Sequence, residues 1–166
     1  MKRLHLLTDR PPLVADAGLL ALRLAVGAIF IVHGAGDVFD AGVSTNIENY
    51  RDAGIPLAEL SAPFTAYVQL IGGIAVVFGA FTRPFSIGFM VAMAGALIYV
   101  HRGEPLAIQP DGSGFGFALM MGAASVALLL LGPGRLSVDR LLARGRARPE
   151  HAIDSAPRTV SGSPAR

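Results

Sequence analysis

The chain of 166 residues contains no cysteine. This absence excludes disulfides, thiolate metal sites and a cysteine persulfide carrier within the chain. Any thiol or sulfur chemistry in which the protein takes part must therefore occur on a partner. The absence of cysteine gives no indication of the cellular compartment.

Charged residues are also scarce. They make up 16% of the chain, whereas an ordinary soluble domain has about 25%. Hydrophobic residues make up 52%, the mean hydropathy is +0.54, and the apolar residues form blocks rather than being spread evenly. This combination predicts an all-α integral membrane protein that forms one helical bundle and is too small for two domains.

Several catalytic signatures are missing as well. The sequence has no phosphate-binding glycine loop, nucleophile elbow, zinc-protease helix or dinucleotide fingerprint. It also has no internal repeat of the kind that indicates a transporter built from inverted halves. The candidate functional residues are therefore the polar groups within the apolar blocks.

Four apolar blocks predict a bundle of four membrane-spanning helices, each needing about 20 residues to cross a bilayer. The first block follows a basic segment at residues 1–16, and we expect it to stay uncleaved because it starts late and exceeds a signal-peptide core in length. A short surface helix is expected over residues 46–53. The predicted spans are about 17–38, 62–81, 85–100 and 115–131, within a membrane domain at 17–142.

The chain changes character after the fourth span. Arginines cluster at residues 135–148, and such a cluster beside a membrane attracts anionic lipid headgroups, which we favour over nucleic acid as its partner. Residues 143–166 lack apolar periodicity and are expected to form a disordered basic tail.

The orientation follows from the basic residues. Lys and Arg number nine in the N-terminal segment, the middle turn and the near C-terminal segment, against two in the other two loops. The positive-inside rule therefore predicts cytoplasmic N and C termini for a multi-pass protein of the plasma membrane.

An ionisable group inside a spanning helix is costly and often marks function. His33 and Asp37 are four residues apart, so their side chains can touch on one face of a helix. On the predicted topology, polar residues from three spans lie at the outer end of the bundle. This predicted outer cluster consists of His33, Asp37, Tyr67, Gln69, Tyr99, His101 and Arg102.

Four interpretations of the predicted outer cluster remain open. Two histidines from different helices can ligate a haem or a metal, a use to which we give the least weight because no spacing specifies it. A histidine with an aspartate partner can relay protons to or from a quinone headgroup. The cluster can also bind a small substrate, or its members can simply hydrogen-bond one another and interfacial water.

Two further polar residues have simpler interpretations. Gln69 is expected to form an interhelical hydrogen bond, worth about 1 kcal/mol. Arg23 lies in the inner half of the first span, where we favour a structural role or a contact with lipid headgroups.

A series of short motifs runs from about residue 19 to residue 142. The motifs are Arg23-x3-Gly27, His33-Gly34, Gly54-Ile55-Pro56, Gly72-Gly73, Gly79-x2-Thr82-Arg83, His101, and the ending Gly132-Pro133-Gly134-Arg135-Leu136-Ser137-Val138-Asp139. In order and spacing they resemble the DoxX family, and the ending is the most specific of them. The resemblance implies a four-helix membrane protein.

The resemblance also implies an association with redox chemistry. Members include a quinone-reducing thiosulfate oxidoreductase subunit and a membrane partner of superoxide dismutase and a sulfurtransferase. We therefore expect a membrane subunit that supports a quinone-linked or redox-stress oxidoreductase system. It would contact quinone through His33, Asp37, Gln69 and His101, and would dock a soluble oxidoreductase or sulfurtransferase.

This chain departs from the family pattern at three positions. Family members often carry a lysine where Asp37 stands, a glutamate where Gln69 stands, and a glutamate near Gly116. All three charges differ here, so the resemblance leaves open whether the chain is an enzyme.

Two other functions fit the same residues. A small-solute transporter would use the predicted outer cluster as its binding site, and substrate-dependent uptake into proteoliposomes would reveal it. A non-catalytic membrane scaffold would tolerate alanine at His33 or His101 with no loss of partner activity. Whether the chain forms a homo-oligomer also stays open.

Overall fold

The computed structural model describes residues 12–146, which form helices and connecting loops without strands. Three stretches are long and apolar enough to cross a membrane: Leu13–Asp40, Ala58–Phe78 and Thr82–Val100. A fourth apolar helix, Gly116–Leu131, has 16 residues. The predicted all-α membrane fold is confirmed, and the cytoplasmic location of both termini stays a prediction.

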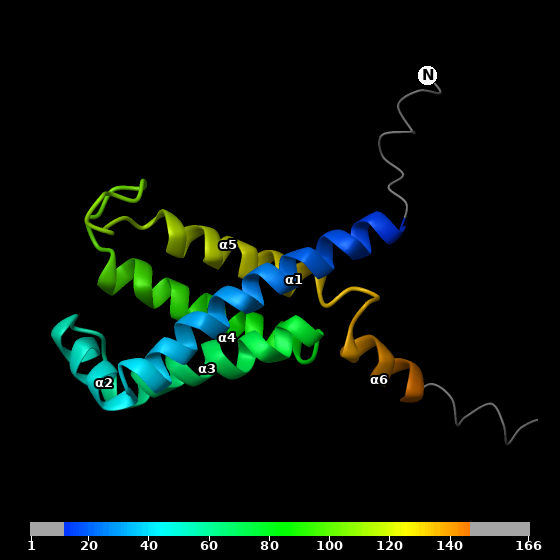
Figure 1. Ribbon diagram of the computed structural model, residues 1–166, viewed down its shortest axis with the longest axis horizontal. Coiled ribbons are helices and arrows are strands. Elements are labelled where there is room, and N and C mark those ends of the chain that lie inside the picture. The colour runs from blue at the N-terminus through cyan, green and yellow to red at the C-terminus, as the bar shows by residue number, and fades with distance from the viewer. Residues whose placement is uncertain (1–11, 147–166) are drawn as a thin grey trace, which may run out of the picture.

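Helices α1, α3, α4 and α5 form a bundle, with α2 at one end and α6 at the other (Figure 1). We call these ends the α2 end and the α6 end. Two π-helical turns, η2 and η3, continue α1 and α4 toward the α2 end. The elements are α1 (Pro12–Ala35), η2 (Gly36–Asp40), α2 (Val43–Asp52), α3 (Ala58–Phe78), α4 (Thr82–Gly95), η3 (Ala96–Val100), α5 (Gly116–Leu131) and α6 (Val138–Arg146).

The first two long helices begin earlier than predicted. α1 begins at Pro12 rather than at residue 17, because proline suits a first helical turn, where its missing amide costs nothing. α3 begins at Ala58 rather than at residue 62. The Leu57 carbonyl accepts the amides of Leu60 and Ser61 at 2.8 Å and so starts this helix.

The short helices α2 and α6 also differ from the sequence-based expectation. α2 begins at Val43 rather than at residue 46. α6 continues to Arg146, so residues 143–146 are helical, although they fall in the tail predicted to be disordered. The rest of that tail, and residues 1–11 of the basic N-terminal segment, lie outside the described residues.

Helices α1 and α3 pack backbone against backbone. A Cβ placed on Gly27 would lie 2.8 Å from the carbonyl oxygen of Gly73, and a Cβ on Gly73 would lie 2.8 Å from the carbonyl oxygen of Gly27. Two turns further along α1 than Gly27, a Cβ on Gly34 would meet the backbone of Ala66 and Leu70. Small residues at these crossings allow the two helices to approach closely, as is common in membrane proteins.

Aromatic and aliphatic side chains fill the centre of the bundle. The rings of Phe30 in α1 and Phe89 in α4 stack with their centroids 3.9 Å apart. The side chains of α5 close the same core from the other side. The buried core consists of Val26, Phe30, Val76, Phe89, Met121 and Leu128.

Candidate functional site

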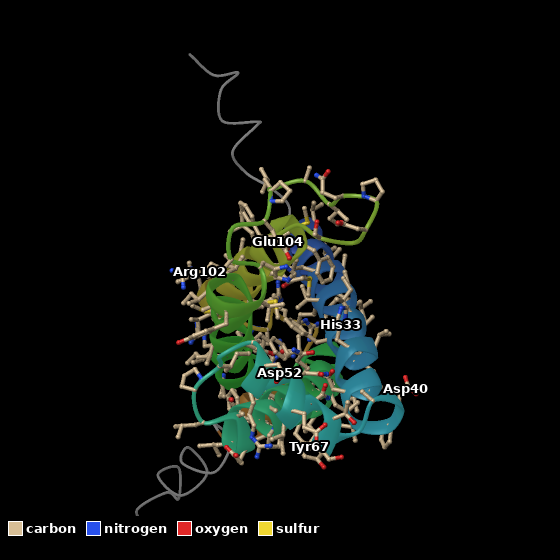
Figure 2. All side chains as sticks on the ribbon, turned by 90° about the vertical axis from the view of Figure 1, so that its left-hand side faces the viewer. His33, Asp40, Asp52, Tyr67, Arg102 and Glu104 are labelled. Atoms are coloured by element: carbon tan, nitrogen blue, oxygen red, sulfur yellow. The ribbon has the colours of Figure 1, made fainter. Side chains whose placement is uncertain are left out.

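The predicted outer cluster lies at the α2 end, which faces the viewer in Figure 2. The structure divides its members into an α1–α2–α3 group and a group in the loop that follows η3.

His33 lies on α1 beside α5, and its side chain is exposed. Its Nδ1 is 2.9 Å from the carbonyl oxygen of Ile29 in the same helix. Because a carbonyl only accepts hydrogen bonds, Nδ1 is the donor in this contact, so in the neutral imidazole the lone pair is on Nε2. The ring stacks on Phe117 of α5, with centroids 5.5 Å apart. His33 therefore presents Nε2 as a base or hydrogen-bond acceptor.

Asp37 follows His33 by about one helical turn and lies in η2. Its carboxylate is half-buried and interacts electrostatically with His33. The buried amide of Asn46 in α2 donates a hydrogen bond of 2.9 Å to the Asp37 carbonyl. Isolated π-helical turns occur often at functional sites, and here the turn brings α2 back against the end of α1.

The other residues of this group come from α2 and α3. Burial raises the pKa of the Tyr50 phenol above its ordinary 10.0; an interaction with the Thr65 side chain offsets part of that rise, and the nearby Asp37 charge adds to it. Thr65 and Gln69 are buried one turn apart on α3. Gln69 is 6% exposed, and its Oε1 has no hydrogen-bond partner within the described chain.

These residues form a polar chain drawn from α1, η2, α2 and α3 at the α2 end, in which Gln69 lies one turn from Thr65. Sequence reasoning identified His33, Asp37 and Gln69. It missed the residues between them, because α2 was expected to lie on the membrane surface. We call it the α2-end polar chain, and it consists of His33, Asp37, Asn46, Tyr50, Thr65 and Gln69.

His101 is held in a separate network. Its Nδ1 lies 2.6 Å from Oε2 of Glu104, and the same oxygen accepts the amide of Gly114 at 2.6 Å. The Gly114 amide and then His101 hold the pKa of Glu104 below its ordinary value of 4.5. Across residues 12–146, His101 shares no hydrogen bond with His33 or Gln69.

The remaining members of the predicted outer cluster are exposed. Tyr67 in α3, Tyr99 in η3 and Arg102 after η3 all present their side chains to the surroundings of the bundle. Figure 2 shows Tyr67 on the opposite side of this end from Arg102. In the part of the chain that the structure describes, no three His, Cys, Asp or Glu side chains are grouped so as to hold a metal ion.

Arg23 lies in α1 toward the α6 end and is 1% exposed. Its Nη2 donates a hydrogen bond to the carbonyl of Leu136, in the turn that precedes α6. Gly79, at the end of α3, adopts a φ of +68°, and a Cβ there would collide with the Arg23 guanidinium and with Cβ of Ser137. The contacts of Arg23 are therefore those of a residue that joins α1 to the C-terminal turn.

Asp139 completes this junction. Its carboxylate accepts the amides of Phe81 at 2.9 Å and of Thr82 at 3.2 Å, at the start of α4. Its own amide donates to the carbonyl of Gly79 at 3.0 Å. Asp139 also interacts electrostatically with Arg23. The C-terminal motif thus fastens α6 to three helices of the bundle.

The comparisons with known proteins agree with this architecture. Residues 18–102 match the family model described as DoxX. The chain is 30% identical over 131 residues to the protein named "Putative oxidoreductase CatD" from Bacillus subtilis (strain 168), an alignment covering 79% of this chain and 91% of that protein. No solved structure matches.

Two further relatives are named as membrane proteins. "Inner membrane protein YphA" from Escherichia coli (strain K12) is 28% identical over 125 residues, which cover 74% of this chain and 88% of that protein. "Uncharacterized membrane protein Rv3486" from Mycobacterium tuberculosis (strain ATCC 25618 / H37Rv) is 30% identical over 136 residues, which cover 75% and 81%.

Proposed function

The chain belongs to the DoxX family of membrane proteins, and we propose that it is a plasma-membrane subunit of an oxidoreductase system that handles protons for a bound quinone. The Bacillus relative is named "Putative oxidoreductase CatD", and this name supports the reaction class. The observation that carries the proposal is the contact between Nδ1 of His33 and the Ile29 carbonyl, which leaves Nε2 as the ring nitrogen that can face a ligand.

In the proposed reaction, this chain and a soluble partner protein have separate tasks. A quinone takes up two electrons and two protons to become a quinol. The electrons come from a reduced soluble partner. The protons pass through His33, because imidazole is a side chain that can both accept and donate a proton.

The α2-end polar chain supports proton movement to and from His33. Asp37 lies one turn away and interacts electrostatically with His33. Tyr50 and Thr65 continue the chain toward α3. Gln69 offers a buried oxygen without a donor, which a quinol hydroxyl can satisfy. Burying such an acceptor without a partner costs about 1–3 kcal/mol, so a ligand that donates to it gains affinity.

The test is the quinone content of the purified protein. Protein in mild detergent is extracted with solvent, the extract is analysed for quinone, and an optical spectrum is recorded from the same sample. We expect about one quinone per chain in the wild type and a several-fold loss in His33→Gln. His101→Gln is the matched control, because His101 belongs to the loop network around Glu104 and its loss should leave the quinone bound.

Four results would contradict the proposal. A quinone-free extract from the wild type would favour a scaffold, and solute uptake into proteoliposomes would favour a transporter. A Soret band would indicate a haem protein instead. Equal loss of quinone from His33→Gln and His101→Gln would show that His33 has no special role.

A further inference from the structure

The α6 end carries a second concentration of polar groups, made of arginines rather than of histidine and acid. A hollow of about 400 Å³ lies between the Gly-Pro-Gly turn and α6. Leu131 and Pro133 line one side of it, Ala143 lines the other, and Arg135 and Arg140 supply charge.

A third arginine approaches the same turn from α4. A Cβ placed on Gly132 would lie 3.5 Å from both Nε and Nη2 of Arg83, so this guanidinium rests against the turn. Arg135, Arg140 and Asp139 line the hollow, and Arg83 lies against Gly132 of the turn beside it, so the three arginines come from three different segments. Arginine forms paired hydrogen bonds with phosphate oxygens, which makes it the preferred side chain for binding this group.

The acids near the hollow are already engaged in the fold. Asp139 accepts the two amides at the start of α4 and faces Arg23. Asp16 accepts the amide of Arg135 at 3.0 Å, and its second oxygen lies 3.8 Å from Nε of that arginine. Within residues 12–146, Arg83 and Arg140 form no ion pair. The hollow therefore keeps an excess of positive charge.

The rim of the hollow is apolar. Leu131 at the end of α5, together with Leu141 and Leu142 in α6, is well exposed. A helix that combines exposed leucines with arginines is typical of one that lies in the membrane interface, with its leucines among acyl chains and its charges at headgroup level. The fitting occupant is therefore an amphiphile with an anionic head.

We propose that the hollow between the Gly-Pro-Gly turn and α6 binds the phosphate group of an anionic phospholipid through Arg83, Arg135 and Arg140. The acyl chains lie against Leu131 and α6. This site is independent of the α2-end polar chain and of any quinone bound there. It fixes α6 in the plane of the membrane surface, next to the junction that Arg23 and Asp139 make with the bundle.

The test is a lipid titration of the full-length protein in mild detergent, followed by native mass spectrometry. The two probes are phosphatidylglycerol, which is anionic, and phosphatidylcholine, which is not. We expect the wild type to prefer phosphatidylglycerol. In the double variant Arg83→Gln/Arg140→Gln its affinity should fall about 25-fold, since each arginine near a membrane surface contributes about fivefold to binding an anionic lipid.

The matched control is Arg102→Gln/Arg144→Gln, which removes the same charge from an arginine after η3 and an exposed arginine of α6. Arg102 lies at the α2 end, and Arg144 neither lines the hollow nor is among the atoms nearest a Cβ on Gly132 or Gly134, so we expect less than a twofold change. An equal loss in both double variants would overturn the proposal, because binding would then follow overall charge. A circular-dichroism spectrum of each variant confirms that its helices are intact.

A second arm separates a lipid from free phosphate. Glycerol 3-phosphate and inorganic phosphate are added in millimolar excess to the protein bound to phosphatidylglycerol. Retention of the lipid supports the proposal, since the acyl chains then contribute to binding. Full displacement would identify a site for a soluble phosphate compound and would overturn it.

Discussion

Arg23 donates a hydrogen bond to the backbone carbonyl of Leu136, 113 residues further along the chain. The guanidinium is buried beneath the turn that precedes α6, and the absence of a side chain at Gly79 makes room for it. A buried charge is tolerated only where partners compensate for its lost hydration. Here the Leu136 carbonyl and the nearby charge of Asp139 supply part of that compensation, while Nε and Nη1 have no hydrogen-bond partner among residues 12–146. The first span and the C-terminal motif therefore depend on each other.

Removal of the Asp139 carboxylate should destabilise the whole protein. Asp139→Ala loses two hydrogen bonds to the amides of Phe81 and Thr82 and the charge that faces Arg23. We expect the free energy of unfolding to fall by about 2–4 kcal/mol, the sum of a lost helix cap and an unpaired cation. The measurement is thermal unfolding in detergent, followed by circular dichroism at the helical minimum.

The matched control for this variant is Asp52→Ala, at the exposed end of α2. A surface substitution of this kind is expected to change the free energy of unfolding by about 0.5 kcal/mol or less. If Asp139→Ala and Asp52→Ala unfolded at the same temperature, Asp139 would have no role in fastening α6 to the bundle.

Gly34 should be intolerant of even a methyl group. A Cβ at this position meets the backbone of Leu70 and Ala66, which cannot move aside as a flexible side chain can. We expect Gly34→Ala to lower the free energy of unfolding by about 1–3 kcal/mol through forced separation of α1 and α3. Gly18→Ala is the control in the same helix, because open space surrounds Gly18.

Gly18→Ala should be neutral or should stabilise the protein by up to about 1 kcal/mol, since alanine favours a helix over glycine. Opposite signs for the two variants in one thermal unfolding series would support direct backbone contact between α1 and α3. A loss of stability in Gly18→Ala that matched the loss in Gly34→Ala would contradict it.

The helical bundle was predictable from sequence because apolar blocks of membrane length have few alternatives. The helix ends were less predictable, for a physical reason that two residues illustrate. Leu57 and Phe81 adopt positive φ values of 53° and 49° immediately before α3 and α4. Sequence patterns assign such conformations to glycine or asparagine, so large apolar residues in these places give no recognisable signal. The π-helical turns likewise have no sequence pattern.

The candidate site was predictable where its residues share a helix. His33 and Asp37 follow from their spacing of four residues. The contribution of α2 was missed because it depends on how that helix folds back on α3, although Asn46 and Tyr50 also have this spacing. The His101–Glu104 contact, by contrast, has a local signal, since residues three apart at the end of a helix lie close together.

The loop around Glu104 should loosen in acid. Hydrogen bonds from Gly114 and His101 stabilise the ionised carboxylate and lower its pKa below 4.5. The contribution of Glu104 to stability is therefore fully present above pH 4.5 and is lost as the pH falls through the lower pKa of the folded state. Glu104→Gln lacks this charge and should lack this pH dependence.

Hydrogen–deuterium exchange of peptides that cover residues 101–115 measures this effect. The ratio of exchange rates in Glu104→Gln and the wild type, taken at the same pH, removes the intrinsic effect of pH on exchange. We expect this ratio to exceed one at pH 6 and to fall toward one as the pH drops below 4.5 and passes through the lower pKa of the folded state. A ratio that stays constant across this range would show that the ionised Glu104 does not hold the loop.

Tyr50 should ionise only above its ordinary pKa of 10.0, because burial disfavours the phenolate, with Thr65 offsetting part of the rise and the Asp37 charge adding to it. The chain has three tyrosines and no tryptophan, so absorbance at 295 nm reports phenolate formation cleanly. Subtracting the titration of Tyr50→Phe from that of the wild type isolates the Tyr50 step. We expect its midpoint above pH 10.

Asp37→Asn tests the electrostatic link within the α2-end polar chain. Removing the Asp37 charge should lower the Tyr50 midpoint, because one of the causes that raise this pKa is then absent. Any stability that depends on neutral Tyr50 is present below pH 10 and is lost as the pH rises through its folded-state pKa, so helical content must be followed in parallel. Tyr99→Phe, in η3, should leave the Tyr50 step unchanged. If Asp37→Asn left it unchanged too, Asp37 and Tyr50 would not be electrostatically coupled, and proton movement between them would have no physical basis.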